Sequence, residues 1–316
     1  MLDIKPFHFE ENTCIEDNDV TIVNWLIHSN INNILYCYQD AWSFPYKSQN
    51  ATILGENFMD QFIENNYQQR LRDLFGLECK YIYTDNVEQV LTLADIEIKK
   101  GKPTKIMLKT NCIPWSEYYG TPNIEFLHEF IITDVDYNNS LITITDGYYG
   151  QYKRLIKFLN VREGYAKQAI QFNFHSKANH SMKDNFLRIL QELISNKDNT
   201  YNNMLDFAND IKKLDNLEQE KCQVVFVDTK LYRNLNRIIM GRMKYALLLK
   251  LIYNQDEIFC KLADEVQKCA ANWKRIQHLL VKADIMKDIK RICDRIESNI
   301  LQAAQKEYTM LNNIIL

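Results

Sequence analysis

The sequence predicts an α+β domain over residues 1–177, followed by an antiparallel all-helical domain over residues 178–316. In the first part, helical and strand-like periodicities alternate, which is typical of a mixed fold. After about residue 178 nearly every segment has helical periodicity, and residues 176–316 contain one glycine, Gly241, and no proline to interrupt a helix. The 316-residue chain is 46% hydrophobic and 25% charged, as expected of a globular protein with a sizeable core.

Helices are predicted in the first part where apolar residues recur three or four positions apart. They cover residues 20–29, 56–76 and 85–101. Gly76 is a suitable C-cap for the second helix. The third helix has an N-cap at Asp85 or Asn86, two lysines in its last turn and Gly101 to stop it.

Strands are predicted where β-forming residues alternate with polar ones between turn signals. They cover residues 79–84, 105–110 and 167–174, and a hairpin is expected over residues 126–150. The segment 152–159 is ambiguous and is interpreted as a short helix. The first part therefore contains both the strands of a sheet and the helices to cover it.

The second part is predicted to consist of long helices. Their helical periodicity covers residues 182–195, 201–214, 231–254, 256–283 and 285–316. One strand-like segment, CQVVFV over residues 222–227, interrupts them.

The bulk properties exclude several classes of protein. A net charge of -3 and a pI of about 6.1 give no general attraction to nucleic acid or to an anionic membrane. No apolar run approaches the length of a bilayer span, and the N-terminus lacks a signal-peptide pattern, so a cytoplasmic protein is expected. The eight cysteines include no CxxC pair, which indicates neither a zinc ribbon nor a redox motif, and no metal site is expected.

The predicted hairpin places a histidine near a carboxylate. His128 lies at the start of its first apolar run and Asp146 at the end of the second, with turn-forming residues 136–140 between them. If His128 and Asp146 are directly opposite, the turn is centred on Tyr137; a two-residue turn at Asn138 and Asn139 shifts the register by three. An imidazole oriented by a carboxylate becomes a general base when a nucleophile is within reach.

Cys14 is the candidate nucleophile, because it follows an extended start and opens the helix that runs through Val20 and Val23 to Leu26. Unpaired N–H groups and the helix dipole stabilise a thiolate at a helix N-terminus, and the same N–H groups can bind an oxyanion. Glu16, Asp17 and Asp19 crowd the first turns and would oppose a thiolate unless they point away. The order along the chain is Cys on a helix, His on a strand and Asp at the end of the next strand.

This order is that of papain-like cysteine peptidases. The segments ENTCIEDNDVTIVNWL and HEFIITDVDYNNSLITITDGYYG, with the helical tail, resemble the family of butirosin biosynthesis protein H, which is related to the bacteriocin-leader peptidases. Members of that family act as acyltransferases on carrier-protein thioesters. The resemblance implies a papain-like domain with an antiparallel sheet, with Cys14 as nucleophile, His128 as base and Asp146 as the residue that orients His128.

Two positions depart from the pattern of these relatives. Papain-like peptidases place an oxyanion-hole Gln six residues before the nucleophile, where this chain has His8. Leader peptidases commonly follow the Asp with Pro, where this chain has Gly147. Asn12 and the backbone N–H of Cys14 are the remaining candidates for binding the oxyanion. A missing Gln suits a thioester, whose carbonyl is more electrophilic than that of an amide.

Two further groups of residues have both a functional and a structural interpretation. Aromatic residues near the predicted site could line an acyl pocket or pack at the edge of the core: Trp115, Tyr118, Tyr119, Tyr148 and Tyr149. Cationic residues on one predicted helix could dock an acidic carrier protein or form a solvated, salt-bridged face: Lys230, Arg233, Arg237, Arg242 and Lys244.

The expected function is a thioester-dependent acyltransferase, an amide synthetase of specialised metabolism. An acyl group would move from the phosphopantetheine arm of a carrier protein to Cys14 and then to a small amine. Phosphopantetheine arrives on the substrate, so no other cofactor is expected, and the chain contains no GxxxxGK[ST] motif for ATP. A cysteine peptidase or amidase with the same three residues and a non-catalytic carrier-protein binder are the two alternatives.

Overall fold

The computed structural model describes residues 1–8, 13–27, 31–49, 53–122, 126–175, 181–221 and 225–314. The chain divides into two compact units. Unit 1 comprises Met1–Ile34 and Gln68–Ala178, and unit 2 comprises Leu35–Tyr67 and Asn179–Leu316. The sequence prediction placed residues 35–67 in the first domain, whereas they cluster with unit 2, because Phe44 and Phe58 pack into the core of the helical unit.

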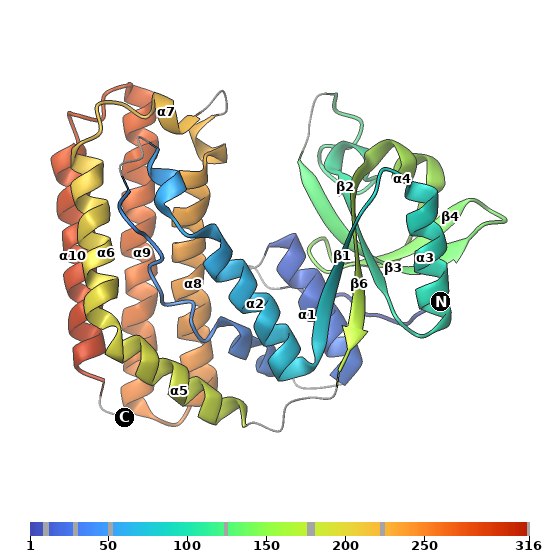
Figure 1. Cartoon of the computed structure of the whole chain (residues 1–316), viewed down its shortest axis with the longest axis horizontal. Coiled ribbons are helices and arrows are strands. Elements are labelled where there is room, and N and C mark those ends of the chain that lie inside the picture. Colours follow the sequence, from blue (N-terminus) through green and yellow to red (C-terminus); the bar gives the residue numbers. More distant parts are fainter. Residues whose placement is uncertain are drawn as a thin grey trace. The chain divides into compact units, whose positions relative to one another are not determined.

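Unit 1 is an α+β structure built on a six-stranded antiparallel sheet with the strand order β1-β6-β2-β3-β4-β5 (Figure 1). The strands are β1 (Leu77–Tyr83), β2 (Thr104–Lys109), β3 (Leu127–Asp136), β4 (Leu141–Asp146), β5 (Gln151–Lys157) and β6 (Tyr165–Phe174). All neighbouring strands pair antiparallel. The predicted mixed fold with an antiparallel sheet is therefore confirmed at this level.

The two faces of this sheet are covered differently. On one face, alternate apolar residues of the central strands, such as Ile106, Phe130 and Ile144, form a core with α3 (Val87–Lys99) and α4 (Phe158–Gly164). The opposite face contacts α1 (Cys14–Ile27) and is partly polar. Figure 1 shows α3 and α1 on different sides of the sheet.

Local signals explain several helix ends in unit 1. The Asn86 side chain accepts a hydrogen bond from the N–H of Gln89 and caps α3, as one of the two alternatives predicted. Gly76 follows α2 (Asp60–Phe75) with φ 69°, and Gly101 follows α3 with φ 76°, a left-handed conformation that suits glycine. The predicted helix over residues 152–159 is wrong, because residues 151–157 form the edge strand β5 paired with β4.

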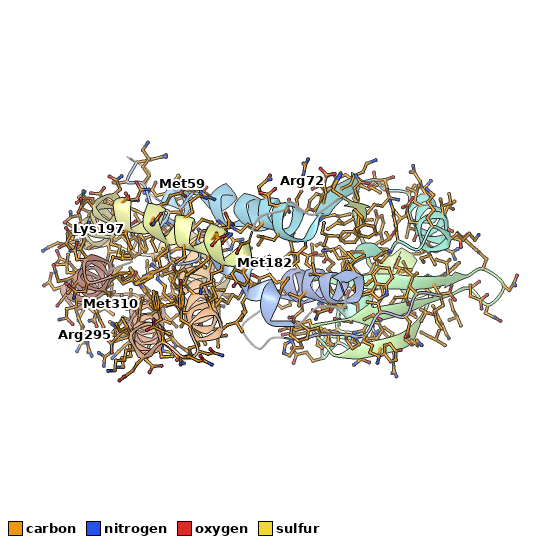
Figure 2. All side chains as sticks on the ribbon, turned by 90° about the horizontal axis from the view of Figure 1, so that it is seen from below. Met59, Arg72, Met182, Lys197, Arg295 and Met310 are labelled. Carbon is orange, nitrogen blue, oxygen red and sulfur yellow. The ribbon has the colours of Figure 1, made fainter. Side chains whose placement is uncertain are left out.

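Unit 2 is predominantly helical. It contains several 3-10 segments and the helices α5 (Met182–Ser195), α6 (Lys197–Lys212), α7 (Glu218–Lys221), α8 (Lys230–Ile252), α9 (Glu257–Met286) and α10 (Cys293–Asn312). In Figure 1, α6, α8, α9 and α10 lie side by side. Figure 2 shows them nearly end-on, with Met182 and Lys197 near the first turns of α5 and α6. Of the described helices, none combines the length and apolar content that crossing a bilayer requires.

Two predicted elements of unit 2 differ from the structure. The last helix begins at Cys293 and not at residue 285, because α9 continues to Met286 and the left-handed residue Lys287 (φ 52°) ends it. The predicted strand over residues 222–227 lies partly outside the described residues, and its end belongs to the 3-10 segment η4 (Phe226–Asp228).

The cationic residues on α8 do not form one exposed patch. Arg242 is fully buried, Lys244 is buried with its ammonium 4.5 Å from the centre of the Tyr38 ring, and Lys230 pairs with Glu56 at 2.8 Å. The prediction that these five cationic residues form one docking patch is therefore wrong, because Arg242 and Lys244 are buried in unit 2.

The core of unit 2 contains a buried ion pair whose carboxylate also accepts hydrogen bonds from two tryptophans. Glu307 Oε2 lies 2.9 Å from Arg242 Nη2, and both side chains are almost completely buried. Trp42 Nε1 donates to Glu307 Oε2 at 2.8 Å, and Trp273 Nε1 donates to Oε1 at 2.7 Å. Arg242 also donates to the carbonyl of Ser43 at 2.7 Å. A buried charge is tolerated when it is paired and hydrogen-bonded in this way.

We expect Glu307→Ala to lower the free energy of unfolding by about 3–5 kcal/mol, because it leaves the Arg242 charge buried and unpaired. The measurement is urea unfolding followed by circular dichroism. Glu257→Ala is the matched control, since Glu257 pairs with Lys261 on the surface and its loss should change stability little. Equal effects of the two substitutions would contradict this account.

Candidate active site

His128 on β3 and Asp146 at the end of β4 form a buried pair. His128 Nε2 lies 2.7 Å from Asp146 Oδ2, and the side chains are 4% and 0% exposed. Because one imidazole nitrogen is held by the carboxylate, the ring orientation is fixed and Nδ1 remains for another partner.

The register of the β3–β4 hairpin explains how these two side chains meet. Near the turn, Asp136 pairs with Leu141, which centres the loop between Asn138 and Asn139. In an antiparallel pair, directly opposite residues share a face, so an uninterrupted register from this turn would place His128 and Asp146 on opposite faces. They would then be unable to form a pair.

A one-residue bulge in β3 changes this outcome. Asp134 pairs with Thr143, but Ile132 pairs with Ile144, so Thr133 is an extra residue on β3. The extra residue reverses which side chains share a face. Continued along the strands, the shifted register places Asp146 across from the residue two positions after His128, so the contact is diagonal. The register predicted from a turn at Asn138 and Asn139 is therefore the observed one between the turn and the bulge, and neither predicted register holds beyond the bulge.

The Asp146 carboxylate accepts hydrogen bonds from two further groups. Trp115 Nε1 donates to Oδ2 at 2.9 Å, and the backbone N–H of Tyr149 donates to Oδ1 at 3.2 Å. With His128, three donors therefore satisfy a carboxylate that has no exposure to water. Trp115, which the sequence suggested as a pocket wall, is observed to hold the Asp146 carboxylate.

Cys14 is the first residue of α1, and the start of this helix is well defined. The backbone N–H of Thr13 donates to Glu16 Oε2 at 2.8 Å, and the N–H of Glu16 donates to Thr13 Oγ1 at 3.4 Å, which is a capping box. The Cys14 thiol is hydrogen-bonded to the His128 ring and is partly exposed. The structure therefore brings together all three residues predicted as catalytic.

The environment of His128 favours its protonated form. Burial alone would lower its pKa, but hydrogen bonds with Asp146 and Cys14, and electrostatic interactions with the same two groups, outweigh burial and raise the pKa of His128 to about 9. At neutral pH the ring is therefore an imidazolium, the form that can pair with a thiolate and donate a proton.

The acidic residues of α1 each have a partner. Glu16 is part of the capping box, Asp17 Oδ2 lies 2.6 Å from His8 Nδ1, and Asp19 Oδ1 lies 2.5 Å from Lys105 Nζ. These partners offset the negative charges of the three carboxylates, so the carboxylates destabilise a thiolate at Cys14 less than the sequence alone suggested.

Lys105, Asp19 and Glu129 form a buried charge cluster between α1 and the sheet. Lys105 Nζ also lies 2.7 Å from Glu129 Oε1, and all three side chains are at most 3% exposed. Burial raises the pKa of both carboxyl groups, that of Glu129 to about 7, while the two carboxylates outweigh burial and hold the pKa of Lys105 above its usual value. The cluster fixes α1 against the sheet.

Asn18 connects the three segments that carry the catalytic candidates. Its side-chain nitrogen donates to the carbonyl of Cys14 at 2.9 Å and to the carbonyl of Glu129, next to His128, at 2.5 Å. Its oxygen accepts from the N–H of Gly147, next to Asp146, at 3.0 Å. Sequence reasoning missed Asn18; a polar residue one turn after Cys14 was its only signal.

Close packing against α1 explains why this chain has Gly147 where the leader peptidases commonly have proline. A Cβ here would lie 2.7 Å from the carbonyl oxygen of Phe7 and 2.8 Å from that of Asp17, so only glycine fits against α1. Proline would also remove the N–H that binds Asn18.

The predicted aromatic residues lie at different distances from the site. The rings of Tyr149 and Tyr148 have centroids 4.9 Å and 5.8 Å from that of His128. Tyr118 packs against Phe126 at 5.4 Å. Asn12, predicted to bind substrate, lies outside the described residues.

Within the described part of the chain, no group of three or more His, Cys, Asp or Glu side chains is arranged to hold a metal ion. Comparison with protein-family models and with curated proteins finds no match to this chain.

We expect NMR to find His128 titrating with a midpoint of about 9. Because this pKa lies above the unfolded value of about 6.5, the charge contributes stability that is complete below pH 6.5 and lost as the pH rises through about 9. Asp146→Asn should lower the midpoint, since it removes the carboxylate. The resonance is assigned with His128→Gln, and a midpoint at or below 6.5 in the unaltered protein would contradict the pairing.

Proposed function

We propose that this protein is a cysteine acyltransferase that forms amides from acyl thioesters. The observation that carries the proposal is the Cys14 thiol, placed at a helix N-terminus and hydrogen-bonded to a buried His128 that Asp146 holds at 2.7 Å. Nucleophile, base and orienting carboxylate in this arrangement support covalent catalysis at a carbonyl.

The proposed reaction has two halves. In the first, the Cys14 thiolate attacks the thioester carbonyl, and His128 protonates the departing thiol, which leaves an acyl group on Cys14. In the second, an amine attacks the acyl-enzyme and expels the Cys14 thiolate, while His128 regains a proton. Thioester aminolysis is downhill, so the cycle needs no ATP.

The backbone supplies a candidate for binding the oxyanion. The capping box uses the N–H groups of Thr13 and Glu16. The N–H of Cys14, at the first helical position, therefore remains suited to stabilise negative charge on the substrate oxygen. One backbone donor with the helix dipole suits a thioester better than a less reactive amide.

The proposal also specifies the acyl donor and the family that the protein resembles. Acyl groups presented as thioesters commonly arrive on a phosphopantetheine arm, so we propose an acyl or peptidyl carrier protein as donor and a small amine as acceptor. The motif order resembles the papain-like family of butirosin biosynthesis protein H and its relative, the amide synthetase of closthioamide biosynthesis. Tyr148, which is 41% exposed beside His128, is the proposed wall for the acyl group.

A cysteine peptidase or amidase is the second candidate, because the same three residues would serve it. It is favoured if the protein hydrolyses peptides but not acyl thioesters. A non-catalytic binder of carrier proteins would keep its function after Cys14→Ala.

The test is intact-protein mass spectrometry after incubation with hexanoyl and benzoyl thioesters of N-acetylcysteamine, which mimic the end of the phosphopantetheine arm. We expect an acyl adduct on the unaltered protein and none on Cys14→Ala. Cys112→Ala is the matched control, since Cys112 is another partly exposed thiol of unit 1 whose pKa is raised by burial, and it should retain the adduct. No adduct with either thioester, or an adduct that persists in Cys14→Ala, would overturn the proposal.

A further inference from the structure

We propose that His8, oriented by Asp17, is a second base that takes the first proton from an ammonium acceptor. This inference rests on the proposed amide-forming activity and assigns a residue that the Cys14, His128 and Asp146 mechanism does not use. It also specifies the acceptor class: an aliphatic amine that is protonated in neutral solution.

His8 and Asp17 form a second histidine–carboxylate pair. His8 Nδ1 lies 2.6 Å from Asp17 Oδ2; Asp17 has no exposure, whereas the His8 side chain is 47% exposed. A buried carboxylate selects Nδ1 as the nitrogen that carries the proton. The neutral ring therefore has its lone pair on Nε2, and its exposure allows proton exchange with water.

The backbone places this pair beside the catalytic candidates. Asp17 lies three residues after Cys14 on α1, and the N–H of Phe7 donates to Thr21 Oγ1 on the same helix at 3.0 Å. The carbonyl of Phe7 lies so close to Gly147 that a Cβ there would be 2.7 Å away. The chain before His8 is therefore held against both α1 and the segment that follows Asp146.

Both imidazoles contact the same aromatic ring, that of Tyr148. The His8 ring is edge-on to Tyr148, with centroids 5.8 Å apart and an interplanar angle of 83°. Tyr148 also contacts His128, with centroids 5.8 Å apart. Because Tyr148 is 41% exposed, an acceptor can contact this ring, which lies beside both imidazoles.

The proton balance of amide formation requires two acceptors for protons. An alkylamine, with a pKa of about 10.4, arrives as an ammonium ion. It loses one proton to His8 Nε2 to become a nucleophile, and its nitrogen then attacks the acyl carbon on Cys14. His128 takes a second proton from the same nitrogen, the carbon–sulfur bond breaks, and the thiolate–imidazolium pair is restored. His8 releases its proton to water.

Attack by water or by an unprotonated amine requires one base, whereas attack by an amine that arrives as ammonium requires two. Neither nucleophile has to lose a proton before attack, so His128 is sufficient for both. Loss of His8 should therefore slow transfer to an alkylamine while leaving hydrolysis and transfer to an unprotonated amine intact. This selectivity separates a base at His8 from a structural role of the same residue.

The experiment follows decay of the Cys14 acyl-enzyme by intact-protein mass spectrometry, after acylation with the hexanoyl thioester of N-acetylcysteamine. Decay is measured at pH 7 in water alone, with propylamine and with hydroxylamine, most of which is unprotonated at this pH. The variant is His8→Asn. His175→Asn is the matched control, because His175 is 44% exposed and lies 2.8 Å from Glu78.

We expect His8→Asn to reduce the propylamine-dependent rate at least about tenfold, since a general base typically contributes 10²–10⁴-fold. The water and hydroxylamine rates should stay unchanged, and His175→Asn should match the unaltered protein in all three. An unchanged propylamine rate in His8→Asn, an equal loss with propylamine and hydroxylamine, or no response of the unaltered protein to propylamine would overturn the inference. Absence of any adduct on the unaltered protein would instead overturn the proposed function itself.

Discussion

The candidate site depends on one irregularity of the sheet, the bulge at Thr133. The turn at residues 137–140 sets a register in which His128 and Asp146 would lie on opposite faces. One extra residue on β3 reverses the faces beyond it and allows the 2.7 Å contact between the two side chains. The short connection and the contact between His128 and Asp146 are thus compatible only because the strand pairing is interrupted between them.

The position of Cys14 depends on a second set of constraints, those that hold α1 against the sheet. Asn18 connects the backbone at Cys14 to the backbone beside each of the other two candidates, and Gly147 allows the close approach. The buried Lys105–Asp19 contact fixes the next part of the helix. The polar residues in the first turns of α1 therefore position the thiol, although by their sequence they suggested an unfavourable charge.

Periodicity and turn chemistry predicted most elements. Chain order, together with the family resemblance, selected Cys14, His128 and Asp146, which lie together in the structure. The edge strand β5 was missed because its polar residues face water and only pairing with β4 determines its conformation. Tertiary packing also determined the placement of residues 35–67, whose aromatic side chains join the helical core. The bulge and the hydrogen bonds of Asn18 to Glu129 and Gly147 could not be predicted, since each depends on segments distant in sequence.

The central claim is that His128 and Asp146 act on Cys14 as one unit. The direct test measures the rate of Cys14 alkylation by iodoacetamide at pH 7, read at that residue by mass spectrometry, in His128→Ala, Asp146→Ala and the double variant. The account predicts a slower rate in each single variant and no further loss in the double variant, because Asp146 acts through His128. Rates equal to that of the unaltered protein, or losses that multiply in the double variant, would contradict it.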